Sequence, residues 1–320
     1  MKKNKIKDTG LEVTELSFGT SSLGSMPDTY GYEVPEDRAQ KTLNRFFQGP
    51  VNMLDTSRNY AMGESEKRIG KAIKDNGGWP KGFLLSTKLD RNMDTLVLDK
   101  NRARESFEES LKTLNVDAVD VLFLHDPEYA KDITDITKKD GAMDELFKIK
   151  NEGLAKAVGV AMGKVDIMFP LLKDWDFDVV INHNRYTLIN REANEMYDYA
   201  YSKNIAIFNA APYAGGVLAK GPDNFKKVTY QDASEEKLAP AREFEKVCKK
   251  HNVEMGAAAL QFSLRDKRIA STICGVTSIE SIEKNLKWAN CEISLEFWEE
   301  VLKLPFSSND PESDRIFTPG

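Results

Sequence analysis

The stretch "VNMLDTSRNYAMGESEKRIGKAIKDNGGWPKGFLLSTK", residues 51–88, contains two short apolar runs separated by an amphipathic segment. Runs of this length, at residues 51–55 and 83–88, are typical of buried strands. Between them, residues 64–75 carry apolar side chains at three-to-four spacing, which predicts a helix. The stretch therefore predicts a strand–helix–strand unit, the repeating element of parallel α/β proteins.

The same alternation continues in both directions along the chain. Candidate strands lie at residues 13–19, 51–55, 83–88, 119–125, 157–162, 178–183, 205–211 and 271–275. Helical patterns occur at residues 36–47, 64–75, 101–114, 140–153, 190–204 and 278–289. Eight strands in this order predict a closed (β/α)8 barrel, the TIM barrel. An open doubly wound sheet is the alternative, but "FGTSSLG" after the first strand lacks the GxGxxG spacing typical of that fold.

Composition and charge exclude several classes of protein. The 320 residues include 45 basic and 51 acidic side chains, for a formal net charge of −6, and the basic residues are scattered. Nucleic-acid partners normally meet a clustered basic face, so we expect none here. The basic start is followed by no apolar segment, and no run of eighteen apolar residues occurs, so we expect a cytoplasmic protein without membrane contact.

Cysteine spacing and linker composition are also informative. The three cysteines form no CxxC or Cys/His pattern, which predicts reduced thiols and no metal site. No linker rich in Pro, Gly or Ser divides the chain, so we expect a single barrel domain over residues 1–320. The polar insertion at residues 220–237 is typical of a surface loop on the face where barrel loops gather, and could cover a site there.

Four titratable residues stand at or just beyond the ends of consecutive predicted strands. Asp55 ends the second strand with Tyr60 just beyond it, Lys88 ends the third, and His125 ends the fourth. Since loops at the carboxyl ends of barrel strands converge over the mouth, we expect these side chains to meet there. Singly, each has an ordinary structural explanation, such as a helix cap or a packed aromatic. Their occurrence together at the ends of consecutive strands favours a functional site.

This set of residues suits proton transfer to an oxygen atom. A tyrosine has an ordinary pKa of about 10 and is a poor acid or base at neutral pH. The ammonium of Lys88 would lower the pKa of Tyr60, and Asp55 would keep Lys88 charged and oriented. His125 can donate a hydrogen bond to a substrate oxygen. The set therefore predicts proton transfer at a carbonyl or hydroxyl group, the polar half of a hydride transfer.

At these residues the chain resembles the aldo-keto reductase superfamily, a family of NAD(P)-dependent (β/α)8 barrels, over nearly its whole length. The segments "MLDTSRNYAMGESEKRIGKAI", "LSTK" and "LFLHDP" are similar to the signatures around that family's catalytic residues. The resemblance implies that Tyr60 is the general acid/base, that Lys88 tunes it, that Asp55 supports Lys88, and that His125 orients the substrate oxygen.

Within the superfamily, "NAAPYAGGVLAKG" and "NRYTLINREA" are similar to the aldose 1-dehydrogenase branch, which includes L-fucose, D-threo-aldose and D-galactose dehydrogenases. The implied reaction is oxidation of a sugar at its anomeric carbon to a lactone. Two alternatives stay open: a general aldehyde or ketone reductase, and a regulatory subunit that binds cofactor with little turnover, like relatives associated with potassium channels. Residues near the mouth could serve sugar hydroxyls or merely pack loops: Tyr30, Tyr32, Arg58, Tyr129 and Arg185. The oligomeric state is left open.

The resemblance also implies a set of cofactor contacts. These are Gly19, Thr20, Asn182, His183, Pro212, Tyr213, Gly215, Gly216, Leu218, Gly275, Thr277, Ser278, Glu283 and Asn285. Many members of the family hold the nicotinamide amide with a Ser-Asn pair after the fifth strand. Ala161 and Met162 stand there in this chain, so that contact is not expected. The family's glutamine at the end of the sixth strand aligns with "INHN", which makes His183 or Asn182 either the substitute donor to the amide or a cap of the next loop.

The last strand and helix bear on the choice between NAD and NADP. NADP-preferring members grip the 2′-phosphate with a basic pair, whereas Gly275 and Ser281 stand at the matching positions. Glu280 and Glu283 would repel an additional phosphate, since phosphate sites use arginine, lysine and helix N-termini. Only the helix start and Lys284 remain to bind one. We therefore expect NAD, with NADP as the alternative.

Overall fold

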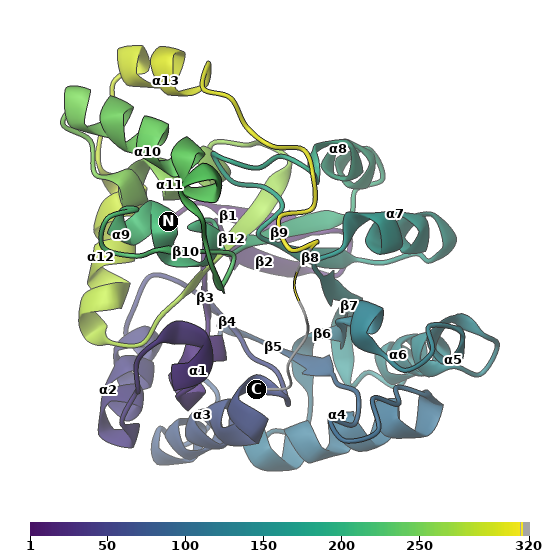
Figure 1. Cartoon of the computed structure of the whole chain (residues 1–320). Helices are drawn as coiled ribbons and strands as arrows, with labels where there is room; N and C mark the ends of the chain where they lie inside the picture. Colours follow the sequence, from purple (N-terminus) through teal and green to yellow (C-terminus); the bar gives the residue numbers. More distant parts are fainter. Residues whose placement is uncertain (314, 316–320) are drawn as a thin grey trace.

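The computed structural model describes residues 1–313 and 315. Its centre is a closed barrel with the strand order β12-β3-β4-β5-β6-β7-β8-β9, in which all neighbouring strands are parallel (Figure 1). The strands are β3 (Leu16–Gly19), β4 (Met53–Asp55), β5 (Leu84–Leu89), β6 (Val119–His125), β7 (Ala155–Met162), β8 (Val179–His183), β9 (Ala206–Ala210) and β12 (Ile269–Gly275). The predicted (β/α)8 barrel is confirmed.

Helices follow the barrel strands and surround them (Figure 1). The main ones are α2 (Glu36–Phe47), α3 (Glu64–Asp75), α4 (Lys100–Leu114), α6 (Ala142–Asn151), α7 (Val165–Asp174), α8 (Asn194–Ser202), α11 (Met255–Leu264) and α12 (Ile279–Asn290). Outside this ring, α10 (Glu235–Lys250) and α13 (Leu295–Val301) pack against each other. Shorter turns are η1 (Ser21–Gly24), α1 (Pro27–Tyr30), η2 (Tyr60–Gly63), η3 (Pro127–Tyr129), α5 (Thr134–Thr137), η4 (Ala214–Gly216) and α9 (Val217–Lys220). Within the described chain, no helix is both long and apolar enough to cross a membrane.

The predicted first strand, residues 13–19, is two elements. Its start belongs to β2 (Leu11–Thr14), which pairs with β1 (Lys3–Ile6) in an antiparallel hairpin, and the barrel strand β3 begins only at Leu16. The apolar pattern runs on through both strands, so the sequence did not reveal the break. Hairpin side chains pack against the inward-facing residues of the barrel, including Ile6 and Val13 against a cluster with Met53 and Phe123. The hairpin therefore closes one end of the barrel.

The register of the strands brings their carboxyl ends to one level. Gly19 lies opposite Asp55, His125 opposite Ala161, and His183 opposite Ala210. Residues that end neighbouring strands therefore face one shared space at the open end of the barrel.

Two further segments reach this end. The insertion at residues 220–237 contains the short antiparallel pair β10 (Lys227–Val228) and β11 (Gln231–Asp232), and α10 begins within it. The chain after α13 runs back across the molecule towards β8, in yellow in Figure 1. We call residues 306–313 and 315 the C-terminal strap. The predicted helix at 190–204 begins only at Asn194, because Asn190 and Arg191 pair with Ser307 of the strap.

Candidate active site

A cavity of about 670 Å³ opens at the carboxyl ends of the barrel strands. Its volume is within the usual range for a small-molecule site. Every barrel strand contributes to its wall at or near its carboxyl end, through Gly19, Asp55, Lys88, His125, Ala161, His183, Ala210 and Gly275. The insertion at residues 220–237 supplies Lys220, Phe225 and Tyr230. The predicted surface loop therefore forms part of the cavity wall.

A buried ion pair lies at one end of this cavity. Lys88 Nζ donates to both carboxylate oxygens of Asp55, at 2.9 and 2.8 Å, and to the carbonyl oxygen of Thr56 at 2.6 Å. Ser86 Oγ donates to Asp55 Oδ1 at 2.5 Å. The side chains of Lys88 and Asp55 are only 1% and 5% exposed. Because each charge is paired and further hydrogen-bonded, the pair can persist in a site of low dielectric constant.

Tyr60 lies against this ion pair. It begins η2, and the Lys88 ammonium is 4.7 Å from the centroid of its ring. Burial, followed by the negative charge of Asp55, raises the pKa of Tyr60 well above its usual value of 10. The net shift is thus opposite in direction to the one expected from Lys88 alone, because burial and the charge of Asp55 decide it. The phenol is a protonated donor at neutral pH.

His125 lies beside Tyr60 and is fixed by a buried carboxylate. The two rings are perpendicular, with centroids 5.7 Å apart. His125 Nδ1 is 2.5 Å from Asp90 Oδ1, while Ser57 Oγ and the Asn59 backbone N–H donate to Asp90 Oδ2 at 2.6 and 3.1 Å. Burial opposes the charged imidazole, but the carboxylates of Asp126 and Asp90 outweigh it and raise the pKa of His125. Its Nε2 is left to donate to a ligand oxygen.

Asp90 is a site residue that the sequence reasoning missed. It follows β5 two positions after Lys88, and alternate strand residues point to the same side, which was the available signal. Its side chain is fully buried. The Asp55, Tyr60, Lys88 and His125 side chains that were predicted to meet do so, and Asp90 completes their hydrogen bonding.

Of the predicted cofactor contacts, those that line the cavity are Gly19, His183, Tyr213, Gly215, Gly216, Gly275, Thr277 and Asn285. Tyr213 donates to Asn285 Oδ1 at 2.5 Å, and its ring packs edge-on against Trp288. Gly275 and Thr277 lie just before the start of α12 and Asn285 lies within it, whereas Gly19 lies opposite Asp55 in the barrel. The structure thus brings more than half of the predicted contacts to the cavity wall.

The remaining predicted contacts do not line the cavity, each for a local reason. Asn182 is fully buried and donates to the carbonyl oxygens of Met162 and Gly163, so His183 is the substitute that reaches the cavity. Glu283 accepts a hydrogen bond from Arg45 at 2.7 Å on the outer surface. The others are Thr20, which donates to the Asp55 carbonyl oxygen, Ser278, which caps α12, and the buried Pro212 and Leu218.

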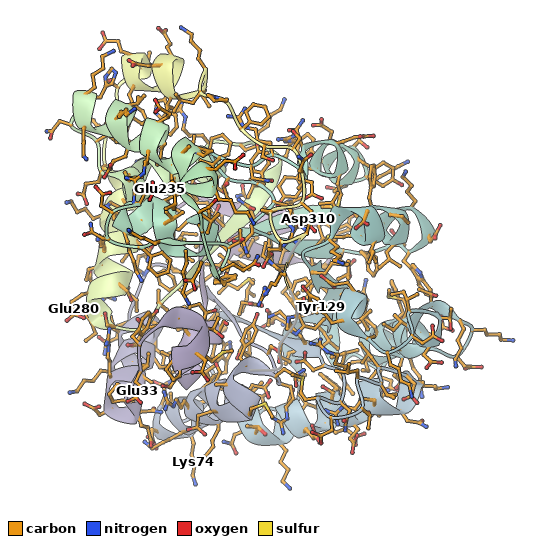
Figure 2. All side chains as sticks on the ribbon, viewed as in Figure 1. Glu33, Lys74, Tyr129, Glu235, Glu280 and Asp310 are labelled. Carbon is orange, nitrogen blue, oxygen red and sulfur yellow. The ribbon has the colours of Figure 1, made fainter. Side chains whose placement is uncertain are left out.

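The residues predicted near the mouth divide in the same way. Tyr30 and Tyr32 line the cavity, whereas Arg58 pairs with Glu109 and Arg185 is buried beneath the C-terminal strap. The Arg91 guanidinium carbon lies 5.5 Å from the centroid of the Tyr129 ring. In Figure 2, Tyr129 and Asp310 appear towards the centre of the view, whereas Lys74 and Glu280 lie at its margin. Four basic residues of the cavity wall were not named from the sequence: Arg38, Arg91, Lys220 and Arg315.

The cavity residues fit an anionic ligand such as a dinucleotide. A Cβ built on Gly275 would meet only Ser22 Oγ, at 3.8 Å, so the backbone at this strand end is open to the cavity. The start of α12 adjoins it with a capping box of Ser278 and Ser281, and Lys284 lies one turn further on. A helix N-terminus and cationic side chains favour phosphate groups. Proton-transfer groups and an anion-binding wall in one cavity are features of a barrel oxidoreductase.

Comparison with known proteins gives the same class. A model of the aldo/keto reductase family matches residues 15–304, and the chain belongs to this family. It is therefore an oxidoreductase of a family that uses nicotinamide cofactors. It is 30% identical to L-galactose dehydrogenase of Arabidopsis thaliana, over 87% of this chain and 85% of that protein. It is 26% identical to D-threo-aldose 1-dehydrogenase of a Pseudomonas species, over 91% and 94% of the two chains.

A solved structure supports the fold. The holo form of an aldo-keto reductase from Bacillus halodurans superimposes with a TM-score of 0.78, covering 99% of this chain and 100% of that one, at 21% identity. The resemblance to the aldo-keto reductases and to their aldose 1-dehydrogenase branch is thus confirmed.

Asp90 is expected to control the charge of His125. In Asp90→Asn, burial still disfavours the imidazolium and one of its two main carboxylate partners is gone, so the pKa of His125 should fall. The chain has three histidines, so a nuclear magnetic resonance titration of 15N-histidine-labelled protein resolves it. Asp94→Asn, at an exposed position on the same loop, is the control and should leave the titration unchanged. An unaltered His125 pKa in Asp90→Asn would contradict this role.

Proposed function

We propose that the protein is an NAD-dependent aldose 1-dehydrogenase that oxidises the anomeric carbon of a sugar to a lactone. The observation that carries the proposal is the meeting of Tyr60, the Lys88–Asp55 ion pair and His125 at one end of the cavity. The names of the relatives, L-galactose dehydrogenase and D-threo-aldose 1-dehydrogenase, support a sugar substrate.

The proposed proton path uses this chain's own residues. A bound nicotinamide cofactor supplies the hydride acceptor. In the oxidative direction the Tyr60 hydroxyl first loses its own proton to solvent. His125 Nε2 and the Tyr60 phenolate then hydrogen-bond the C1 hydroxyl, and the phenolate accepts the hydroxyl proton as the C1–H bond breaks. Lys88 stabilises negative charge on the Tyr60 oxygen, and Asp55 holds Lys88 in place. In the reverse direction Tyr60 donates the proton, which its raised pKa favours at neutral pH.

Asp126 favours a polyhydroxylated substrate over a simple aldehyde. Its carboxylate lines the cavity, with Oδ2 3.7 Å from His125 Nε2. Its Oδ1 is buried and has no hydrogen-bond partner among the residues described. The carboxylate lines the cavity, so it can accept a hydrogen bond from a ligand hydroxyl there. An aldose carries such a hydroxyl next to C1, whereas a simple aldehyde does not.

NAD is the cofactor that we propose, with NADP as the alternative. Gly275 and Ser281 offer no cation for a 2′-phosphate, and the exposed Glu280 is close enough to Arg38 for the two charges to interact. This interaction reduces the attraction that Arg38 would have for an additional phosphate. Glu283 plays no part, because it pairs with Arg45 outside the cavity.

We also assign the enzyme to the cytoplasm and to one barrel domain over residues 1–320. The support for the location is that Cys248, Cys274 and Cys291 are free thiols, which suit a reducing compartment.

Removing the Tyr60 hydroxyl tests the proposed function. In Tyr60→Phe the proton acceptor is lost, so aldose oxidation should slow by roughly 10²–10⁴-fold while cofactor affinity is retained. Steady-state rates of reduced-cofactor formation and a fluorescence titration with NAD measure the two effects. Tyr30→Phe is the control, since it removes another hydroxyl of the cavity wall, one bonded to Ser21. Near-normal turnover in Tyr60→Phe would sink the assignment.

Removing the Asp126 carboxylate tests the substrate class. Asp126→Ala should lower kcat/KM for an aldose relative to kcat/KM for butan-1-ol, both measured as oxidations, by roughly tenfold or more, because only the sugar loses a hydrogen bond to a charged acceptor. Any effect through the charge of His125 is common to both substrates and cancels in the ratio. Asp126→Asn retains an acceptor oxygen and should show a smaller change. An equal loss with both substrates would refute this role of Asp126.

A further inference from the structure

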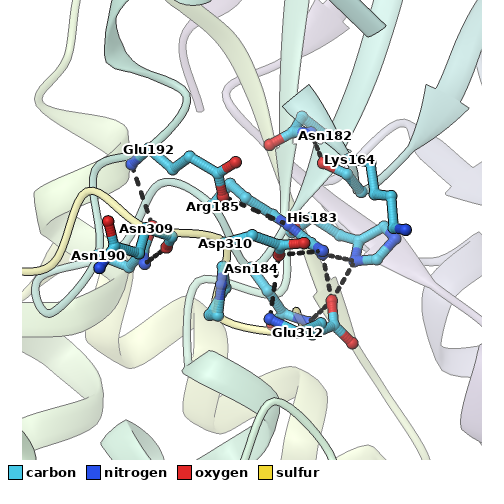
Figure 3. A network of polar contacts seen from close by, with 12 residues as sticks. Lys164, Asn182, His183, Asn184, Arg185, Asn190, Glu192, Asn309, Asp310 and Glu312 are labelled. Carbon is cyan, nitrogen blue, oxygen red and sulfur yellow. Dashed lines mark hydrogen bonds and ion pairs between the residues drawn. The ribbon is translucent and has the colours of Figure 1, made fainter. Parts of the chain in front are cut away.

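The C-terminal strap is attached to the barrel by a buried polar network that the proposed chemistry does not use. Asn190 Nδ2 donates to the Asn309 carbonyl oxygen at 2.8 Å, and Thr229 Oγ1 donates to that of Pro311 at 3.1 Å. Figure 3 shows the side chains of Arg185, Asp310 and Glu312 converging beneath the strap. The strap is thereby joined to the loop after β8 and to the insertion before α10.

Arg185 is the centre of this network. Its side chain is 1% exposed; Nη1 donates to Glu312 Oε2, and Nη2 donates to Asp310 Oδ1 at 2.6 Å. Glu312 is equally buried and uses its other oxygen, Oε1, to accept from Arg315 at 2.6 Å. Two fully buried opposite charges therefore link the strap to the end of β8, where removal of one partner would leave the other uncompensated.

Each member of this ion pair contacts a residue of the cavity wall. Arg185 Nη1 is 3.4 Å from His183 Nδ1 (Figure 3) and also donates to the His183 carbonyl oxygen at 3.3 Å. His183 lines the cavity. Glu312 holds Arg315, which also lines the cavity and lies 5.6 Å from the centroid of the Tyr230 ring. The strap thus contacts two residues of the cavity wall, His183 through Arg185 and Arg315 through Glu312.

The contact with Arg185 determines which nitrogen of His183 carries the proton. A guanidinium has no acceptor, so Nδ1 must accept, and a neutral imidazole then has its proton on Nε2. Burial lowers the pKa of His183, the carboxylate of Glu312 opposes this, and the charge of Arg185 adds to the lowering, so the net direction is downward and the ring stays neutral. Glu312 Oε2 is 3.6 Å from Nδ1, too far for a hydrogen bond, and already accepts from Arg185. Nε2 makes no hydrogen bond within residues 1–313 and 315.

We propose that the buried Arg185–Glu312 ion pair is a positioning unit for the cavity. It holds His183 as the Nε2–H tautomer, a hydrogen-bond donor to an acceptor oxygen of the bound ligand, and it holds Arg315 beside Tyr230. The inference rests on the proposed function where that oxygen is assigned to the carboxamide of the nicotinamide. Docking of the strap and binding of the cofactor are then coupled, so each strengthens the other.

The tautomer is read directly from the free protein. The three imidazoles of 15N-histidine-labelled protein are resolved by two-dimensional nuclear magnetic resonance, and His183→Asn assigns one of them. We expect His183 to show an unprotonated Nδ1 and a protonated Nε2 throughout the neutral pH range. A protonated Nδ1, or a rapidly exchanging mixture, would overturn the proposal. This reading requires no cofactor, so it stands or falls separately from the proposed function.

Variants then test the coupling. Arg185→Met removes the donor to Nδ1, so His183 should become a mixture of tautomers and the Kd for NAD should rise roughly three- to tenfold, as for one lost hydrogen bond. Hydrogen exchange of residues 306–313, measured by mass spectrometry, should slow on addition of NAD in the parent protein and should not respond in Arg185→Met.

Arg191→Met is the matched control. The Arg191 guanidinium carbon lies 4.0 Å from the centroid of the Phe306 ring in the strap, and within residues 1–313 and 315 Arg191 makes no hydrogen bond or ion pair with His183. Its loss should therefore loosen the strap while the tautomer persists. Arg185→Lys, which keeps a charged donor without an acceptor, is the second variant and should retain the tautomer. An unchanged tautomer and Kd in Arg185→Met would refute the positioning role. Absence of NAD binding in the parent protein would instead refute the cofactor assignment.

Discussion

The buried ion pair between Lys88 and Asp55 is the interaction on which the site depends. It forms because β4 and β5 are neighbours in a register that pairs Asp55 with Ser86, two residues before Lys88. Two charges removed from water are stable only if their remaining hydrogen bonds are satisfied, and Ser86 and the Thr56 carbonyl oxygen provide these. The closed barrel supplies both the register and the shielding from solvent. Tyr60 therefore lies next to the Lys88 ammonium, which its hydrogen bonds hold in a fixed position.

The same principle recurs around the cavity. His125 faces the ligand space with one nitrogen and is held by Asp90 through the other, and Asp90 is itself satisfied by Ser57 and a backbone N–H. We infer a comparable arrangement for His183, with Arg185 behind it. An imidazole whose nitrogen away from the cavity is hydrogen-bonded to a buried partner has one orientation and one protonation pattern. A group that reacts with or binds a ligand requires such a fixed state.

Much of this could be predicted from the sequence, for physical reasons. Apolar runs of strand length alternate with amphipathic helices, and the bounds of α2 and α3 were predicted to the residue. Asp55, Lys88 and His125 were found because barrel strands point their carboxyl ends to one face. Local patterns could not separate β2 from β3, since both are apolar. Local patterns also could not show which way two side chains point. Asn182 is held by the carbonyl oxygens of Met162 and Gly163, and Glu283 is held by Arg45.

The remaining features are properties of three-dimensional contacts. Arg185 and Glu312 are 127 positions apart in the sequence, and no local pattern links them. The raised pKa of Tyr60 depends first on burial and then on the charge of Asp55, neither of which a motif encodes. Asp90 lies one residue beyond the end of β5, so a search restricted to the last residue of each strand does not find it.

The most direct measurement is the initial rate of reduced-cofactor formation with NAD and with NADP, across L-galactose, D-galactose, L-fucose and D-arabinose. The account predicts that at least one aldose is oxidised to its lactone, with higher catalytic efficiency for NAD than for NADP. Cofactor binding without oxidation of any of these sugars would contradict the aldose dehydrogenase assignment. Equal or higher efficiency with NADP would contradict the proposed cofactor preference.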